Sequence, residues 1–307
     1  MANPFKKIMK EPKRRKLNSR NPKPGAYLGV PADTYHGANA LNNSSLKKML
    51  TSPKHFQLPR EDRPALLYGR LYHELTLTPR QFKSNWAIYE GAARRGKAWE
   101  EFQAEHAGKD ICTVKEHTEA KALAKAVRQS DLGTEYLKGA GHNEVSLVWH
   151  EEVDGMPLTL KCRTDRLAIR DGVPCVVDLK GTTASNKDEF AREAAKYHYE
   201  MQAAWYMRGV EQALDVTLSN EDFVFLAVEK STLITCAYWL PEDAVHYGRQ
   251  KMDGALRRYV QCVRENRWPA PNNGKAEELT NYFPSPFEGM EVVDMAGLEV
   301  EPLGVAA

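Results

Sequence analysis

The chain has 307 residues, of which 42% are hydrophobic and 27% charged, as is usual for a globular protein with its own core. No stretch approaches the roughly 18–20 apolar residues of a membrane helix, and the N-terminus lacks the apolar segment of a secretory signal. We therefore expect no membrane association and a cytoplasmic protein. Five scattered cysteines without a C-x-x-C pair favour reduced thiols over a zinc or iron–sulfur centre.

The net charge of +2 conceals a basic N-terminus. In residues 1–24, nine lysines and arginines accompany Glu11 alone, so this segment carries +8 and the rest of the chain −6. Frequent prolines and little apolar periodicity predict a flexible arm over residues 1–28. Such an arm can bind DNA phosphates through counterion release, or it can be a solubilising tail. The candidate DNA-binding residues in it are Lys13, Arg14, Arg15 and Lys16.

The first half of the chain reads as helical. A polar N-cap at residues 42–45 precedes a short helix that Pro53 ends. The apolar run at 64–77 predicts a buried helix, and the Ala-, Lys- and Glu-rich segments 92–107 and 116–129 predict two more.

The second half alternates between strand and helix periods. The predicted elements are strands at 144–150, 158–169 and 173–180, a helix at 187–214, strands at 223–228 and 233–239, and a helix from Pro241 to about residue 267. This order predicts an α/β fold with a central mixed β-sheet flanked by helices. We expect a single domain over residues 29–270 and a tail over residues 271–307.

Two acidic residues and a lysine lie on neighbouring predicted strands. Asp165 is on one strand, Asp178 and Lys180 are on the next, and a turn signal separates the strands. Asp178 and Lys180 are two residues apart, so their side chains share a face. Carboxylates bind hard cations and a lysine stabilises charge developing on a phosphate, so a hairpin here would suit a magnesium site that cleaves phosphodiesters. Taken alone, Asp178 and Lys180 are equally well explained as an ion pair on an edge strand.

Further polar residues flank this set. His73 lies four residues after Gly69 on an apolar helical face, as a core histidine or as a metal ligand. Gln202 and Tyr206 share a helix face, either as a polar stripe or as groups that orient the lysine, a water or a phosphate. Glu144, at the start of a strand, is a possible additional carboxylate or a solvated strand end.

The joint order is much more specific than its parts. G-x-x-x-H in a helix, D and D-x-K on neighbouring strands, and Q-x-x-x-Y on the next helix resemble the RecB-like branch of the PD-(D/E)XK nucleases. More narrowly, the chain resembles the RecE-type (exonuclease VIII-like) exonucleases of phages and prophages. The resemblance covers roughly residues 40–270 and includes the segments Asn43–Leu46, Ser52–Phe56, Ala65–His73, Lys161–Arg166 and Tyr199–Tyr206.

The resemblance implies a restriction-endonuclease-like core with an N-terminal helical elaboration. It also implies two Mg²⁺ ions, for which Mn²⁺ is a possible substitute. The implied metal ligands are His73, Asp165, Asp178 and the backbone carbonyl of Leu179. The implied catalytic residues are Lys180, Asp165, Asp178, Gln202 and Tyr206. Thr164 stands where many relatives have proline, and Gly181 where RecE-like proteins often have threonine, but neither change removes a ligand.

The implied activity is 5′→3′ degradation of linear duplex DNA in a bacterial host cell, which leaves 3′ single strands for an annealing protein during phage recombination. A ring-like homo-oligomer is also implied. The alternatives are a nuclease that trims single strands or cuts endonucleolytically, and a DNA-binding module that no longer cuts. The intact set of Asp165, Asp178 and Lys180 argues against the last alternative.

Overall fold

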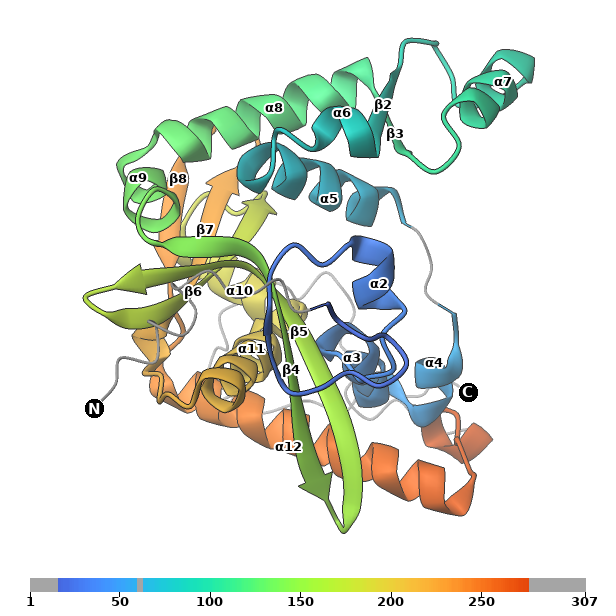
Figure 1. Cartoon of the computed structure of the whole chain (residues 1–307), viewed down its shortest axis with the longest axis vertical. Helices are drawn as coiled ribbons and strands as arrows, with labels where there is room; N and C mark the ends of the chain where they lie inside the picture. Colours follow the sequence, from blue (N-terminus) through green and yellow to red (C-terminus); the bar gives the residue numbers. More distant parts are fainter. Residues whose placement is uncertain (1–15, 60–62, 276–307) are drawn as a thin grey trace, which may run out of the picture. The chain divides into compact units, whose positions relative to one another are not determined.

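The structure is a computed structural model that describes residues 16–59 and 63–275 (Figure 1). The chain divides into two units, with the boundary between Ala270 and Pro271. All described elements except the short η2 (Pro271–Gly274) belong to the first unit. No helix in the described ranges is long and apolar enough to span a membrane.

A six-stranded mixed sheet forms the centre of the first unit, with the strand order β1-β4-β5-β6-β7-β8. The strands are β1 (Gly25–Tyr27), β4 (Gly141–Val153), β5 (Met156–Arg170), β6 (Val173–Thr182), β7 (Phe223–Glu229) and β8 (Thr235–Tyr238). β6 and β7 are parallel, and the other neighbours are antiparallel. The predicted α/β fold with a central mixed sheet is confirmed.

Helices cover both faces of this sheet (Figure 1). One face carries α3 (Asn43–Thr51), α10 (Lys187–Lys196), α11 (Tyr199–Leu214) and α12 (Glu242–Glu265). The other face carries α5 (Pro64–Leu77), α8 (Val114–Gln129) and α9 (Asp131–Leu137). The remaining elements are α2 (Ala32–His36), α4 (Pro53–Gln57), α6 (Phe82–Asn85), β2 (Trp86–Tyr89), α7 (Lys97–Glu105), β3 (Asp110–Thr113) and η1 (Asn220–Asp222).

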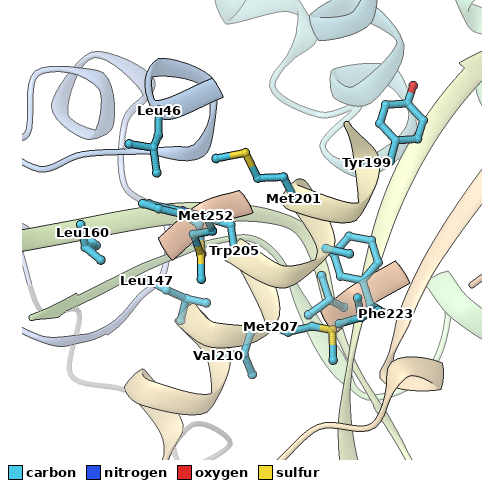
Figure 2. Packing of buried hydrophobic residues seen from close by; sticks show 14 of the residues in the cluster. Leu46, Leu147, Leu160, Tyr199, Met201, Trp205, Met207, Val210, Phe223 and Met252 are labelled. Atoms are coloured by element: carbon cyan, nitrogen blue, oxygen red, sulfur yellow. The ribbon is translucent and has the colours of Figure 1, made fainter. Parts of the chain in front are cut away.

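Because side chains alternate along a strand, the buried residues of β6 belong to two different core clusters. In β6, Val176 packs on the α11 face, whereas Val177 and Leu179 pack on the α5 face. Asp178 and Lys180 therefore project toward α11. Figure 2 shows the first cluster, in which side chains of α11 lie among residues of β4, β5, β7 and α12; those labelled on α11 are Tyr199, Met201, Trp205, Met207 and Val210.

The sheet divides between β5 and β6. Their ladder runs from the Arg170–Val173 pair to the Arg166–Val177 pair. Past the latter pair, β5 stays with β4, whereas β6 continues alongside β7 to Thr182. We call this division the fork. Asp165 and Asp178 are the first residues beyond the last pair of the ladder, so both lie at the fork.

The flexible arm predicted over residues 1–28 extends too far toward the C-terminus. Residues Gly25–Tyr27 form the edge strand β1, which pairs with β4, and Leu17 is buried against Val148 of that strand. The Tyr27 hydroxyl also donates a hydrogen bond to the carbonyl of Lys23, at 2.7 Å. A three-residue strand preceded by proline has too little period for sequence patterns to reveal it. Residues 1–15 lie outside the described part of the chain.

The single helix predicted over residues 187–214 is two helices. α10 ends at Lys196 and α11 begins at Tyr199, because His198 adopts a left-handed conformation with φ of 53°. The helix predicted over residues 92–107 is also shorter, since α7 begins at Lys97 after Gly96, whose φ is 79°. The amphipathic pattern over 187–214 and the Ala-, Lys- and Glu-rich composition over 92–107 continue across these positions, so neither could locate them.

Gly248 allows α12 to pack against the first turn of α11. A Cβ at Gly248 would lie 2.1 Å from the backbone oxygen of Glu200, whereas a Cβ at Gly254 of the same helix meets nothing within 4 Å. We expect Gly248→Ala to lower the free energy of unfolding by about 1–3 kcal/mol through overpacking. Gly254→Ala should raise it by about 0.5–1 kcal/mol. Urea unfolding of both variants measures this, and equal stabilities would contradict the close approach of the two helices.

Candidate active site

Asp165 joins the two strands at the fork. Its Oδ2 accepts a hydrogen bond of 2.7 Å from the backbone N–H of Leu179. Its Oδ1 lies 3.1 Å from Nδ1 of His73. The carboxylate thus satisfies an N–H on β6 at the place where the two backbones have stopped pairing.

His73 reaches the same place from α5, on the other side of the sheet from α11. Its Nε2 lies 3.1 Å from the carbonyl oxygen of Leu179. The ring therefore bridges the Asp165 carboxylate and a backbone carbonyl. Burial alone would lower the pKa of His73, but the Asp165 carboxylate outweighs burial and raises the pKa to about 9. Conversely, burial would raise the pKa of Asp165, but His73 lowers it.

Gln202 on α11 contacts two of the other predicted catalytic residues, Asp178 and Lys180. Its Nε2 donates to Asp178 Oδ1 at 2.7 Å, and its Oε1 accepts a hydrogen bond from Lys180 Nζ at 3.3 Å. Lys180 Nζ also forms an ion pair with Asp178 Oδ2. The three side chains form a closed triangle, so the ammonium and the carboxylate are each fixed by two partners.

The donor set at the fork suits a hard divalent cation. Asp178 is 2% exposed, with its Oδ1 bound to Gln202 and its Oδ2 paired with the Lys180 ammonium. Burial raises the pKa of Asp178, and Lys180 offsets only part of this. Two buried carboxylates and an imidazole are the kinds of oxygen and nitrogen ligand that such ions bind. Within the described ranges, however, no three His, Cys, Asp or Glu side chains are grouped closely enough to hold one.

Two aromatic rings whose role the sequence did not predict lie beside the ammonium of Lys180. Its Nζ lies 4.5 Å from the ring centroid of Tyr199 and 5.7 Å from that of Phe225. The Tyr199 hydroxyl donates to Glu193, which also accepts a hydrogen bond from Thr182. In the sequence, Tyr199 begins the segment Tyr199–Tyr206 that carries the family resemblance, three residues before Gln202, but the sequence predicts no role for it.

Lys47 on α3 is a second lysine near the site, and it carried no sequence signal at all. Its Nζ donates to the carbonyl oxygen of Tyr197 at 2.8 Å. Burial and the charge of Lys180 lower the pKa of Lys47 to about 8. The pair of lysines makes this side of the site suitable for a negatively charged group.

Glu144 lies across from Asp165, in a gap of the β4–β5 ladder between the pairs made by Asn143 and Val145. Its φ of 54° is unusual for a residue within a strand. It forms an ion pair of 3.7 Å with Arg163. Burial and then Asp165 raise the pKa of Glu144 to about 7. The structure therefore places a third carboxylate beside Asp165.

Tyr206 lies one turn after Gln202, half-buried, with its ring centroid 6.2 Å from that of Phe223. Burial and the nearby Asp178 raise its pKa. In the described structure no hydrogen bond joins Tyr206 to Asp178, Lys180 or Gln202, and its ring contact is with Phe223.

The structure thus brings most of the predicted site residues to the fork in two contact sets. One joins His73, Asp165 and Leu179, and the other joins Asp178, Lys180 and Gln202. The predicted DNA-binding residues Lys13, Arg14 and Arg15 lie outside the described part of the chain, and Lys16 is exposed at its start.

The chain is similar to known proteins over most of its length. The family described as "PDDEXK-like domain of unknown function (DUF3799)" matches residues 42–281. No curated protein matches the chain. One similar solved structure, a "Putative exonuclease" from Eubacterium rectale, is 14% identical, with a TM-score of 0.48, covering 78% of this chain and 94% of its own. Another, SSO0001, is 14% identical, with a TM-score of 0.30, covering 70% and 75%. Because the family match covers most of the sequence, the chain belongs to this PDDEXK-like family, within the PD-(D/E)XK nuclease superfamily.

Proposed function

We propose that the protein is a divalent-metal-dependent deoxyribonuclease that degrades linear duplex DNA from an end. The observation that carries the proposal is the contact network at the fork, where His73 from α5 meets Asp165 and Leu179 although 106 residues separate it from Leu179. Asp178 and Lys180 flank Leu179 on the same strand. Carboxylates, an imidazole and a lysine gathered in this way suit metal-assisted phosphodiester hydrolysis, and the chain belongs to a PDDEXK-like family.

Asp165, Asp178, His73 and the Leu179 carbonyl would hold the metal, with two Mg²⁺ ions as our expectation and Mn²⁺ as a substitute. Bound there, the metal would supply an activated water and stabilise the leaving oxygen.

The protein's own contribution centres on Lys180. Gln202 and Asp178 hold its ammonium in place, so it can neutralise charge that develops on the phosphate without first reorganising. The rings of Tyr199 and Phe225 exclude water from one side of the ammonium, which strengthens its electrostatic effect.

The finer parts of the proposal rest on the resemblance of the motifs to RecE-type exonucleases. They are 5′→3′ polarity, 3′ single-stranded products for an annealing partner in phage recombination, and a ring-like homo-oligomer.

The proposed activity predicts cleavage that depends on DNA ends and on metal. With Mg²⁺, the purified protein should release mononucleotides from 5′-labelled linear duplex and should stop when EDTA is added. Asp178→Ala and Lys180→Ala should each reduce the rate by at least about 100- to 1,000-fold with an unchanged circular dichroism spectrum. Lys125→Ala, at an exposed position on α8, is the matched control and should cleave like the wild type.

Other outcomes of this assay identify the alternatives. Cleavage of closed circles would indicate an endonuclease, and preference for unpaired strands a single-strand trimming enzyme. Release from the 3′ label would reverse the proposed polarity. DNA binding without any cleavage would indicate a binding module, and full activity in Lys180→Ala would refute the role given to that lysine.

Gln202 should affect the cleavage rate by holding Asp178 and Lys180 in place. Gln202→Leu keeps the side-chain size but removes both hydrogen bonds, so we expect a 10- to 100-fold loss of activity, the usual range for a group that orients metal ligands. Gln212→Leu, at an exposed position of the same helix, should have no such effect. Measuring the Mg²⁺ concentration for half-maximal rate in both variants separates a loss of metal affinity from a loss of turnover.

The basic arm should contribute to DNA affinity. Deleting residues 1–15 removes six basic residues but spares the buried Leu17. The dissociation constant for duplex DNA should rise, and the slope of log K against log salt should flatten by about 0.9 for each phosphate that the arm no longer neutralises. If affinity and salt slope both stay at the full-length values, the arm is a solubilising tail.

A further inference from the structure

The joint between α10 and α11 carries an exposed aromatic side chain beside the proposed active site. Tyr197 is 50% exposed, and its ring stacks against that of Tyr199 with centroids 6.0 Å apart and planes inclined by 28°. Tyr199 in turn lies against the ammonium of Lys180, at 4.5 Å. Two rings therefore connect the catalytic lysine to the surface.

The backbone at this joint is arranged to keep the two rings together. His198, between them, adopts the left-handed conformation with φ of 53°, which is uncommon for any residue other than glycine. Such conformations persist where the surrounding structure enforces them, and they gather at functional sites. Here Glu200 lies 3.3 Å from His198 Nδ1 and forms an ion pair of 2.6 Å with Lys251 of α12.

Two lysines lie at Tyr197, one at its backbone and one over its ring. Lys47 Nζ donates to the carbonyl oxygen of Tyr197 at 2.8 Å, and Lys196 Nζ lies 5.6 Å from the Tyr197 ring centroid. The nearby carboxylates are already engaged, since Lys251 pairs with Glu200, and Glu193 accepts hydrogen bonds from Tyr199 and Thr182. A half-exposed aromatic ring with one lysine over it and a second lysine at the backbone of the same residue is complementary to a nucleotide, which offers a flat base and a negative phosphate.

We propose that Tyr197 and Lys47 form a nucleotide subsite for an unpaired part of the cleaved strand: a base stacks on Tyr197, and the phosphate next to the scissile one pairs with Lys47. The subsite rests on the proposed nuclease function and deepens it. A base stacked on the Tyr197 ring would displace the Lys196 ammonium. The ammonium would then face the same DNA strand. Only an unpaired base can offer its face to a side chain, so the substrate end must be frayed or single-stranded at this point.

Binding without cleavage tests the subsite. The probe is a single-stranded oligonucleotide of about 12 nucleotides with 2-aminopurine at each of the terminal positions in turn, mixed with the full-length protein in EDTA. Stacking on Tyr197 should quench the fluorescence at one position. Tyr197→Leu should remove this quenching and weaken binding by about 5- to 100-fold, whereas Tyr197→Phe, which keeps the ring, should retain both.

The matched control is Trp239→Leu. Trp239 is exposed to a similar extent, 51%, but among the described residues no lysine lies over its ring. This variant should bind like the wild type. Lys47→Met should weaken binding and flatten the salt slope by about 0.7, the value for one phosphate of a single strand. Because Tyr197 is half-exposed, its substitutions should fold, and thermal unfolding checks this.

Two results would overturn the subsite. One is wild-type affinity and quenching in Tyr197→Leu, and the other is an equal loss in Tyr197→Leu and Trp239→Leu. Either result, obtained with a wild-type protein that cleaves DNA with Mg²⁺, rejects the subsite and leaves the nuclease function standing. If the wild type cleaves nothing but the Tyr197 effects appear in EDTA, the nuclease proposal fails and the binding site stands.

Discussion

The hydrogen bond from the Leu179 N–H to the Asp165 carboxylate is the interaction on which the site depends. Where β5 and β6 separate, backbone donors lose their partners, and leaving one unpaired in the protein interior would cost about 1–3 kcal/mol. A charged side chain supplies the missing acceptor. The divided sheet therefore carries a buried negative charge at its branching point, and His73 is the group that balances it.

The negative charge of Asp178 is compensated by a different set of partners. Asp178 has Lys180 and Gln202 as partners, all held on the α11 face, whereas Asp165 is paired from the α5 face. Burying charge is tolerable only when geometry and hydrogen bonds compensate for lost hydration. The two halves of the site thus come from opposite sides of the sheet, and they can meet only because the strands part between them.

Sequence patterns predicted the parts of the fold that have a strong period. The helix at Pro64–Leu77 and the strands carrying Asp165 and Asp178 were found, as was the order of polar residues that identified the superfamily. The edge strand β1, the break at His198 and the hydrogen bond of Lys47 with Tyr197 were not found. All three arise from tertiary interactions between distant segments, which leave no local signature in one sequence.

The packing of α12 on α11 has a consequence for when the site becomes complete. The backbone of Gly248 supports the first turn of α11, which carries Gln202, although no residue of α12 lies in the site itself. A chain still being synthesised, or one truncated before residue 242, would contain every proposed metal ligand and Lys180 but would lack that support. The placement of Gln202 therefore depends on a helix that is synthesised after every residue of the proposed site.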